Sequence, residues 1–235
     1  MSFIIALHIG EGLVMASDSR ITYNTTSNNV DGSKSIQLGV HFSNSTPKTF
    51  LTPSKVGISC CGDSSIKNKP ITGYIESFVE EHKNDGIDTI KDFVIPYFTG
   101  LEAGLNTTFI LGGYANVSGC VIQKLYRINT KTKIVEEIDT STQGAVWSGE
   151  IDVMSRILTT VYSKTTKGKY DEIVSYPILW QYFTLQDAVD FARYAIKTTI
   201  DTMKFQSRVK TVGGSIDILV IKPTEAFWIE KRELQ

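Results

Sequence analysis

Hydrophobic and polar positions divide the beginning of the chain into strand-like stretches. Residues 3–9 and 13–16 are rich in apolar and β-branched side chains, and Gly10-Glu11-Gly12 separates them. Two such runs around a glycine-containing turn predict a β-hairpin. Because the apolar residues are continuous rather than alternating, we expect this hairpin to belong to a sheet that is covered on both faces.

The next stretch has a different composition. Residues 21–47 are dominated by Asn, Ser, Thr and Gly and show little periodicity. This pattern predicts either a long loop or a weakly paired excursion from the main body. Residues 48–51 and 55–61 then predict a second hairpin that turns at residues 52–54. Residues 62–65, Gly-Asp-Ser-Ser, end its second strand.

Helical periodicity follows. Apolar residues recur at helical spacing over residues 71–83 and again over 87–101, which predicts two amphipathic helices. A third helix is expected to begin near Ile151 and a fourth to cover residues 185–203. Between and after them, strands are predicted at residues 107–113, 119–128, 133–138, 145–147, 216–221 and 226–229.

The order of these elements is strands, two helices, strands, two helices, strands. Pairs of helices on the two outer faces of antiparallel sheets would explain both the covered strands and the grouping of the helices. The sequence therefore predicts the α+β class and a four-layer αββα sandwich. No internal repeat, low-complexity tract or long linker interrupts the chain, so we expect a single domain over residues 1–235.

Composition excludes several classes of function. The net charge is −1, with 24 Lys and Arg against 25 Asp and Glu, and no basic stripe favours nucleic-acid binding. No apolar run is long enough to span a bilayer, and the beginning of the chain lacks a secretion signal. The three cysteines have neither disulfide-framework nor zinc-site spacing. We expect a cytoplasmic protein without membrane, metal or cofactor.

Ser2 offers chemistry because it follows Met1. Aminopeptidases of the cytosol remove an initiator Met when the next side chain is small. Ser2 would then carry both a hydroxyl and a free α-amine, whose ordinary pKa is about 7.7–8.0. Such an amine can act as the base that activates its own hydroxyl. Many ordinary chains begin with Met-Ser, so the hypothesis depends on the residues that follow.

Four stretches resemble the β-subunit class of the proteasome and its bacterial relatives. They are Ala16-Ser17-Asp18-Ser19-Arg20, Lys48-Thr49-Phe50, Cys60-Cys61-Gly62 and Trp147-Ser148-Gly149. An ungapped alignment on Asp18 places Ser2 on the catalytic threonine of that family. Residues 201–204 and 211–219 are similar to the bacterial branch called Anbu. The resemblance implies an N-terminal nucleophile hydrolase with the αββα fold.

The resemblance also implies roles for individual residues. Ser2 would be the nucleophile, Lys48 the cation that favours its deprotonation, and Asp18 the partner that holds Lys48. Gly62 would donate its N–H to the oxyanion, and Ser148 would hold the amine. The substrate would lie extended between Thr22 and Gly62, with Cys60 at the floor of the first specificity pocket.

The chain departs from the family pattern at three points. The nucleophile is Ser rather than Thr, and the interval between Asp18 and Lys48 is longer than usual. Val209 stands where the family has an aspartate, and Asp201 is the candidate replacement. Without the resemblance, Asp18 and Lys48 also fit a structural ion pair, Ser148 fits a helix N-cap, and Cys60 and Cys61 fit buried small apolar residues.

Three functions stay open at this point. The first is a serine- or threonine-type peptidase that forms an acyl-enzyme with peptides or unfolded proteins inside a ring-forming homo-oligomer, with an ATP-dependent unfoldase partner suggested by analogy. The second is a non-catalytic scaffold or binding protein, which would follow if Met1 is retained. The third is an amidase of the same superfamily that acts on small non-peptide amides.

Overall fold

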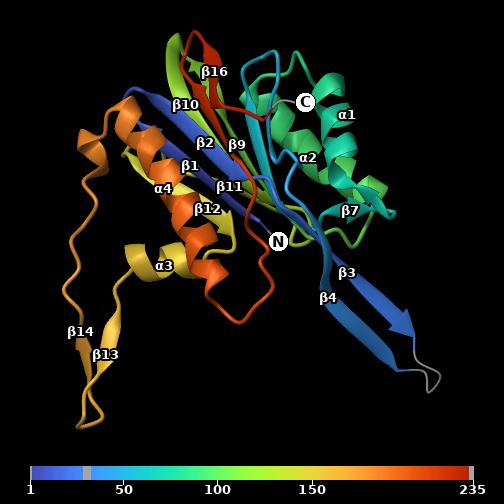
Figure 1. The fold of residues 1–235 in the computed structure, drawn as a ribbon. Helices are drawn as coiled ribbons and strands as arrows, with labels where there is room; N and C mark the ends of the chain where they lie inside the picture. Colours follow the sequence, from blue (N-terminus) through green and yellow to red (C-terminus); the bar gives the residue numbers. More distant parts are fainter. Residues whose placement is uncertain (1, 29–32, 233–235) are drawn as a thin grey trace.

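The computed structural model describes residues 2–28 and 33–232, and its main body contains two five-stranded antiparallel sheets (Figure 1). The first sheet has the strand order β12 (Gly144–Gly149), β1 (Phe3–Ile9), β2 (Gly12–Asp18), β15 (Ile216–Ile221) and β16 (Ala226–Glu230). The second has the order β11 (Ile134–Glu137), β10 (Cys120–Asn129), β9 (Thr107–Val117), β6 (Gly57–Gly62) and β5 (Thr49–Leu51).

Helices pack against each sheet. Apolar residues of α4 (Leu185–Lys204) and α3 (Asp152–Leu158) form one core cluster with the first sheet. Those of α1 (Ile71–Glu81) and α2 (Ile87–Leu101) form another with the second sheet. A third cluster joins residues of both sheets. The α+β class is thereby confirmed, while the complete four-layer order stays a prediction.

The first hairpin behaves as its continuous apolar pattern predicts. Every residue of β1 and β2 is buried. Successive side chains of a strand point to opposite faces, so Phe3 and Ile5 join the helix-facing cluster whereas Ile4 and Ala6 join the cluster shared with the second sheet. This alternation explains why most positions of both strands are apolar rather than every second one.

Residues 21–47 contain a paired excursion, and the alternative of a long loop is wrong. Strands β3 (Ile21–Asn28) and β4 (Lys34–Ser43) pair as a two-stranded ribbon that projects from the body (Figure 1). Their pairing register shifts between Tyr23 and Thr25. Most described side chains of the ribbon are exposed, so no buried face imposes the alternating pattern that would have identified the strands.

Several short elements were not predicted. Strands β13 (Tyr162–Lys164) and β14 (Tyr170–Glu172) pair as a second projecting hairpin. Strands β7 (Ser65–Ile66) and β8 (Lys69–Pro70) form a short antiparallel pair before α1. A single 3₁₀ turn, η1 (Trp180–Tyr182), leads into α4, which begins with a capping box between Thr184 and Asp187. These strands span two or three residues, too few to show a periodicity.

Within residues 2–28 and 33–232, no helix is both long enough and apolar enough to cross a lipid bilayer.

Replacement of Phe109 by Ala tests the packing under α1 and α2. Phe109 is fully buried in β9 with its ring centroid 4.6 Å from that of Phe98. We expect Phe109→Ala to lower the free energy of unfolding by about 3–5 kcal/mol in urea titrations. The control is Phe205→Ala, which removes a ring that is 91% exposed and should change stability by less than about 0.5 kcal/mol. Equal losses in the two variants would contradict this assignment of the core.

Candidate active site

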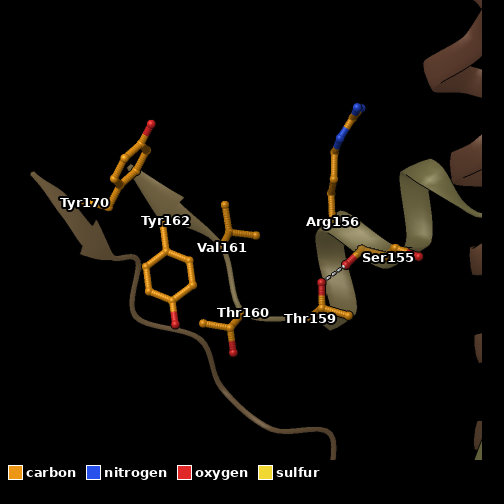
Figure 2. Close-up of a pocket in the computed structure, with 7 residues that line it drawn as sticks. All are labelled: Ser155, Arg156, Thr159, Thr160, Val161, Tyr162 and Tyr170. Carbon is orange, nitrogen blue, oxygen red and sulfur yellow. Dashed lines mark hydrogen bonds between the residues drawn. The ribbon is translucent and has the colours of Figure 1, made fainter. Parts of the chain in front are cut away.

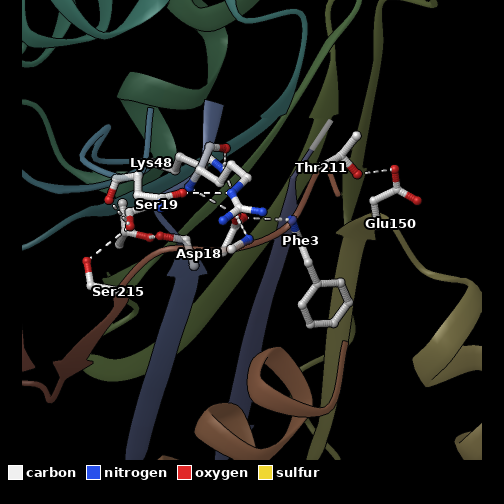
Figure 3. A network of polar contacts seen from close by, with 12 residues as sticks. Phe3, Asp18, Ser19, Lys48, Glu150, Thr211 and Ser215 are labelled. Carbon is white, nitrogen blue, oxygen red and sulfur yellow. Dashed lines mark hydrogen bonds and ion pairs between the residues drawn. The ribbon is translucent and has the colours of Figure 1, made fainter. Parts of the chain in front are cut away.

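The carboxylate of Asp18 lies at the end of β2 and is fully buried. Its Oδ1 accepts hydrogen bonds from the backbone N–H of Phe3, at 3.1 Å, and from Nζ of Lys48, at 2.8 Å. Its Oδ2 accepts the backbone N–H groups of Arg20, at 3.1 Å, and Gly213, at 2.9 Å (Figure 3). A buried charge is stable only when it is paired and hydrogen-bonded, and these four donors meet that condition.

Lys48 connects the two sheets at this point. Lys48 is 4% exposed and immediately precedes β5 of the second sheet. Its Nζ binds the carboxylate of Asp18, in the first sheet, and the carbonyl oxygen of Arg20. The carbonyl oxygen of Lys48 accepts the N–H of Cys60 at 2.9 Å. Most residues of the long interval between Asp18 and Lys48 belong to the β3–β4 ribbon, which leaves the body of the protein and rejoins it at the same place.

Ser2 is brought to the same cluster. It is 7% exposed, and its carbonyl oxygen accepts the backbone N–H of Glu150 at 2.8 Å. Gly149 packs so closely that a Cβ on it would lie 1.8 Å from the Ser2 oxygen and 3.4 Å from the Cβ of Cys61. The following residue, Phe3, donates to the same oxygen of Asp18 that binds Lys48. Met1 lies outside the described residues.

Gly62 ends β6 with its N–H directed toward the side of Lys48. The N–H of Cys60 points to the carbonyl oxygen of Lys48, whereas the N–H of Asp63 points to Asn106 beside β9. Because backbone groups of a strand alternate in direction, the N–H of Gly62 lies on the Lys48 side. Gly62 has φ of +123°, and a Cβ there would lie 2.3 Å from the Asn106 oxygen, so only glycine fits.

The other predicted residues occupy defined places. Ser148 is buried in β12 opposite Ile4, so its prediction as a helix N-cap is wrong: β12 extends to Gly149, and the cap of α3 is Ile151. Thr22 lies in β3, and its Oγ1 is buried without a hydrogen-bond partner among the described residues. Cys60 is buried beside α1 and α2, as expected for a small apolar residue.

Asp201 stands apart from this cluster. It lies on α4, and its partly exposed carboxylate binds Nζ of Lys197, at 2.8 Å, and Nζ of Lys204, at 2.6 Å. Hydrogen bonds from these two lysines lower the pKa of Asp201 to about 2. Both partners belong to the same helix, and no contact among the described residues joins Asp201 to Asp18 or Lys48.

Glu150 and Thr211 form a buried hydrogen-bonded pair that the sequence did not identify. Oε1 of Glu150 accepts the hydroxyl of Thr211 at 2.6 Å, and its Oε2 accepts a guanidinium N–H of Arg208 at 3.2 Å. Glu150 lies between Gly149, the last residue of β12, and the start of α3. Its partner is 61 residues away along the chain, so no local pattern marks the pair.

The pocket in Figure 2 lies elsewhere, between the end of α3 and the β13–β14 hairpin. It has a volume of about 680 Å³ and is lined by residues such as Arg156, Tyr162 and Tyr170. None of its lining residues belongs to the Asp18–Lys48 cluster, so this hollow is separate from the candidate active site.

Comparisons with known proteins agree with this geometry at the level of the fold. No protein-family model and no curated protein matches the sequence. Among solved structures, the chain is similar to a Gly-1 mutant of Anbu from Hyphomicrobium sp. strain MC1, with a TM-score of 0.60 and 16% identity over 97% of this chain and 87% of the other. Anbu from Yersinia bercovieri, described as an ancestral beta-subunit, gives 0.58 and 16% over 97% and 86%. The chain therefore has an Anbu-like, proteasome-related fold.

Removal of the Lys48 charge should destabilise the protein. Lys48→Met leaves the Asp18 carboxylate buried without its cation, a change that typically costs 3–5 kcal/mol. Because three backbone N–H donors remain, we expect a loss of about 3 kcal/mol in the free energy of unfolding. The control is Lys197→Met, which removes an exposed ion pair and should cost under about 1 kcal/mol. A Lys48 variant as stable as the control would contradict the buried pairing.

The cysteines should differ in reactivity. Burial raises the pKa of both Cys60 and Cys61 to about 12, whereas Cys120 is exposed. Thiolate is the reactive form, and it becomes abundant at Cys60 and Cys61 only as the pH approaches 12. At pH 7.5 we expect iodoacetamide to modify the native protein once, at Cys120, and the urea-denatured protein three times, as measured by intact mass. Rapid double or triple modification of the native protein would contradict the burial of this pair.

Proposed function

We propose that this chain is a peptidase of the N-terminal nucleophile hydrolase class and that Ser2, freed by removal of Met1, is its nucleophile. One observation carries the proposal: the N–H of Phe3, next to Ser2, and Nζ of Lys48 share a single oxygen of the buried Asp18. The Anbu-like fold supports the same class. The apolar clusters on both sides of the two sheets and between them support the αββα order of layers.

The reaction begins at the Ser2 hydroxyl. Its oxygen attacks a peptide carbonyl while its proton passes to the neutral α-amine of the same residue, directly or through water. The ammonium of Lys48 favours the deprotonated hydroxyl by its charge, and Asp18 holds that ammonium in position. The amine then returns the proton to the departing amino group. The resulting Ser2 ester is hydrolysed by water, which restores the hydroxyl.

Gly62 and β3 would hold the substrate. The direction inferred for the N–H of Gly62 suits a donor to the oxyanion. A donor of this kind typically stabilises the transition state by about 2.7–4 kcal/mol. Strand β3 pairs only with β4 among the described strands, which leaves its other edge for an extended peptide at Thr22. Cys60, small and apolar, would lie at the floor of the first specificity pocket.

The assembly is part of the proposal. Exposed apolar side chains gather on the two projecting hairpins and on residues 173–182, including Leu38 and Phe42 of β4 and Tyr162 and Tyr170 of the second hairpin. Such surfaces are typical of protein contacts. They support a homo-oligomer that encloses its active sites. A cytoplasmic location and an ATP-dependent unfoldase partner are further parts of the hypothesis that rest on sequence and analogy.

Intact mass and a covalent probe test this function. After expression we expect the mass to lack one Met residue, and a β-lactone probe to acylate residue 2, as located by peptide mass spectrometry. Ser2→Thr should retain acylation and hydrolysis of fluorogenic peptides, whereas Ser2→Ala should lose both. Ser77→Ala, which removes an exposed hydroxyl from α1, is the control and should leave both rates unchanged.

The alternatives give different results in the same experiment. Retention of Met1 with no acylation would overturn the peptidase proposal and favour a scaffold. Acylation of Ser2 with turnover of acylated amino acids but not of peptides would favour an amidase.

A further inference from the structure

Glu150 is held against Ser2 on the side opposite Asp18. The carbonyl oxygen of Ser2 accepts from Glu150, and the N–H of the same peptide unit, which belongs to Phe3, donates to Asp18. In a trans peptide these two groups point in opposite directions, and the described chain contains no cis peptide. Residue 2 therefore lies between Glu150 at the end of β12 and Asp18 at the end of β2. Figure 3 shows Phe3 between the Glu150–Thr211 pair and the Asp18–Lys48 pair.

The loop before β15 crosses the same end of β1. Thr211 donates its hydroxyl to Glu150, and Gly213, two residues later, donates its N–H to Asp18. The loop thus binds both carboxylates that flank the beginning of the strand. Thr211 and Glu150 are both buried, so their hydrogen bond is shielded from water.

The direction of the Thr211 hydrogen bond decides what its oxygen can still do. An ionised carboxylate only accepts, so Thr211 must be the donor. Its hydroxyl carries one hydrogen and two lone pairs, and the hydrogen is used on Glu150. The oxygen of Thr211 can therefore only accept a further bond. A group placed beside it must be a donor, and the α-ammonium of a processed Ser2 is such a donor.

The charges divide in the same way. On the Asp18 side, Lys48 binds the carboxylate, and the guanidinium of Arg20 lies against Gly213, whose N–H binds the same carboxylate. On the Glu150 side, Arg208 binds both Glu150 and Asp152, at 3.2 and 3.0 Å, and Arg156 also binds Asp152, at 3.6 Å.

Lys48 therefore lies on one side of residue 2, where its charge favours loss of the hydroxyl proton, and Glu150 lies on the other, where its carboxylate favours the ammonium form of the amine. Environments that shift two groups in opposite directions are typical of acid–base sites.

We infer that Glu150 and Thr211 are positioning residues for the α-amine of Ser2: Thr211 accepts its N–H, and Glu150 fixes the Thr211 hydroxyl and raises the basicity of the amine. This inference rests on the proposed function. The sequence assigned the acidic role to Asp201 on α4, and this inference assigns it instead to Glu150, which follows β12.

The experiment measures acylation of Ser2 by the β-lactone probe between pH 5 and 9, on full-length protein with Met1 removed. The amine acts as a base only when neutral, so the rate rises with pH through the pKa of the amine. The charged groups on this amine's two sides are Asp18, Asp217, Lys48 and Arg20 on one and Glu150, Asp152, Arg156 and Arg208 on the other, and Cys61 stays neutral over this range. Loss of the Glu150 charge lowers the pKa of the amine, because a nearby carboxylate favours the ammonium form.

Glu150→Gln is the principal variant, since it keeps the backbone bond to Ser2 and an oxygen that accepts from Thr211. We expect it to lower the plateau rate at least about tenfold and to move the rising limb to lower pH. Thr211→Val should lower the plateau similarly, and Thr211→Ser should restore it to within about threefold. Asp190→Asn is the control, because it removes an exposed carboxylate that pairs with Arg193 on α4 outside this network, and it should leave the plateau within about threefold of wild type.

The outcomes separate the two proposals. If wild-type Ser2 is not acylated, the proposed function falls and this inference falls with it. If wild-type Ser2 is acylated and Glu150→Gln keeps both the rate and the pH profile, only the positioning role is overturned. If Asp201→Asn reduces the rate while Glu150→Gln does not, the acidic role belongs to Asp201. Thermal unfolding of each variant identifies any loss that is due to the fold.

Discussion

The buried carboxylate of Asp18 is the interaction on which this end of the molecule depends. Its four donors come from the start of β1, from the turn after β2, from the loop before β15 and from Lys48 beside β5. A carboxylate withdrawn from water requires all of them, since an unpaired buried charge is costly. One side chain thereby fixes four segments that are distant in sequence, and it does so next to residue 2.

The same requirement explains how the chain tolerates a long excursion between Asp18 and Lys48. The β3–β4 ribbon leaves the body after Arg20 and returns at residues 44–47, where Ser19 and Arg20 hydrogen-bond to Asn44. The ends of the ribbon are fixed by these contacts, while most of its described side chains are exposed and take no part in the Asp18 network. Its length can therefore vary without displacing the lysine.

Residue 2 lies between two clusters of charged side chains, one around Asp18 and one around Glu150. The hydroxyl and the amine of an N-terminal nucleophile need nearby charges of opposite sign, because the hydroxyl must lose a proton and the amine must accept it. Lys48, paired with Asp18, supplies a cation on one side, and Glu150, bonded to Thr211 and Arg208, supplies a carboxylate on the other. The order β12, β1, β2 within one sheet places these sides on the two edges of a single strand.

The sequence by itself determined the elements with strong periodicity, and it predicted the pairing of Asp18 with Lys48 that the structure contains. Burial on both faces of β1 and β2 and the amphipathic α1 and α2 leave patterns that can be recognised within a few residues. Only the tertiary structure decided the place of Asp201 on the surface of α4, the position of Ser148 within β12, and the pairing of Glu150 with Thr211. Ser148 and the Glu150–Thr211 pair have the same physical reason: their neighbours lie far away in the chain, and such contacts leave no local pattern in the sequence. Asp201 binds lysines of its own helix, and only the packing of α4 on the sheet decides where that face of the helix lies.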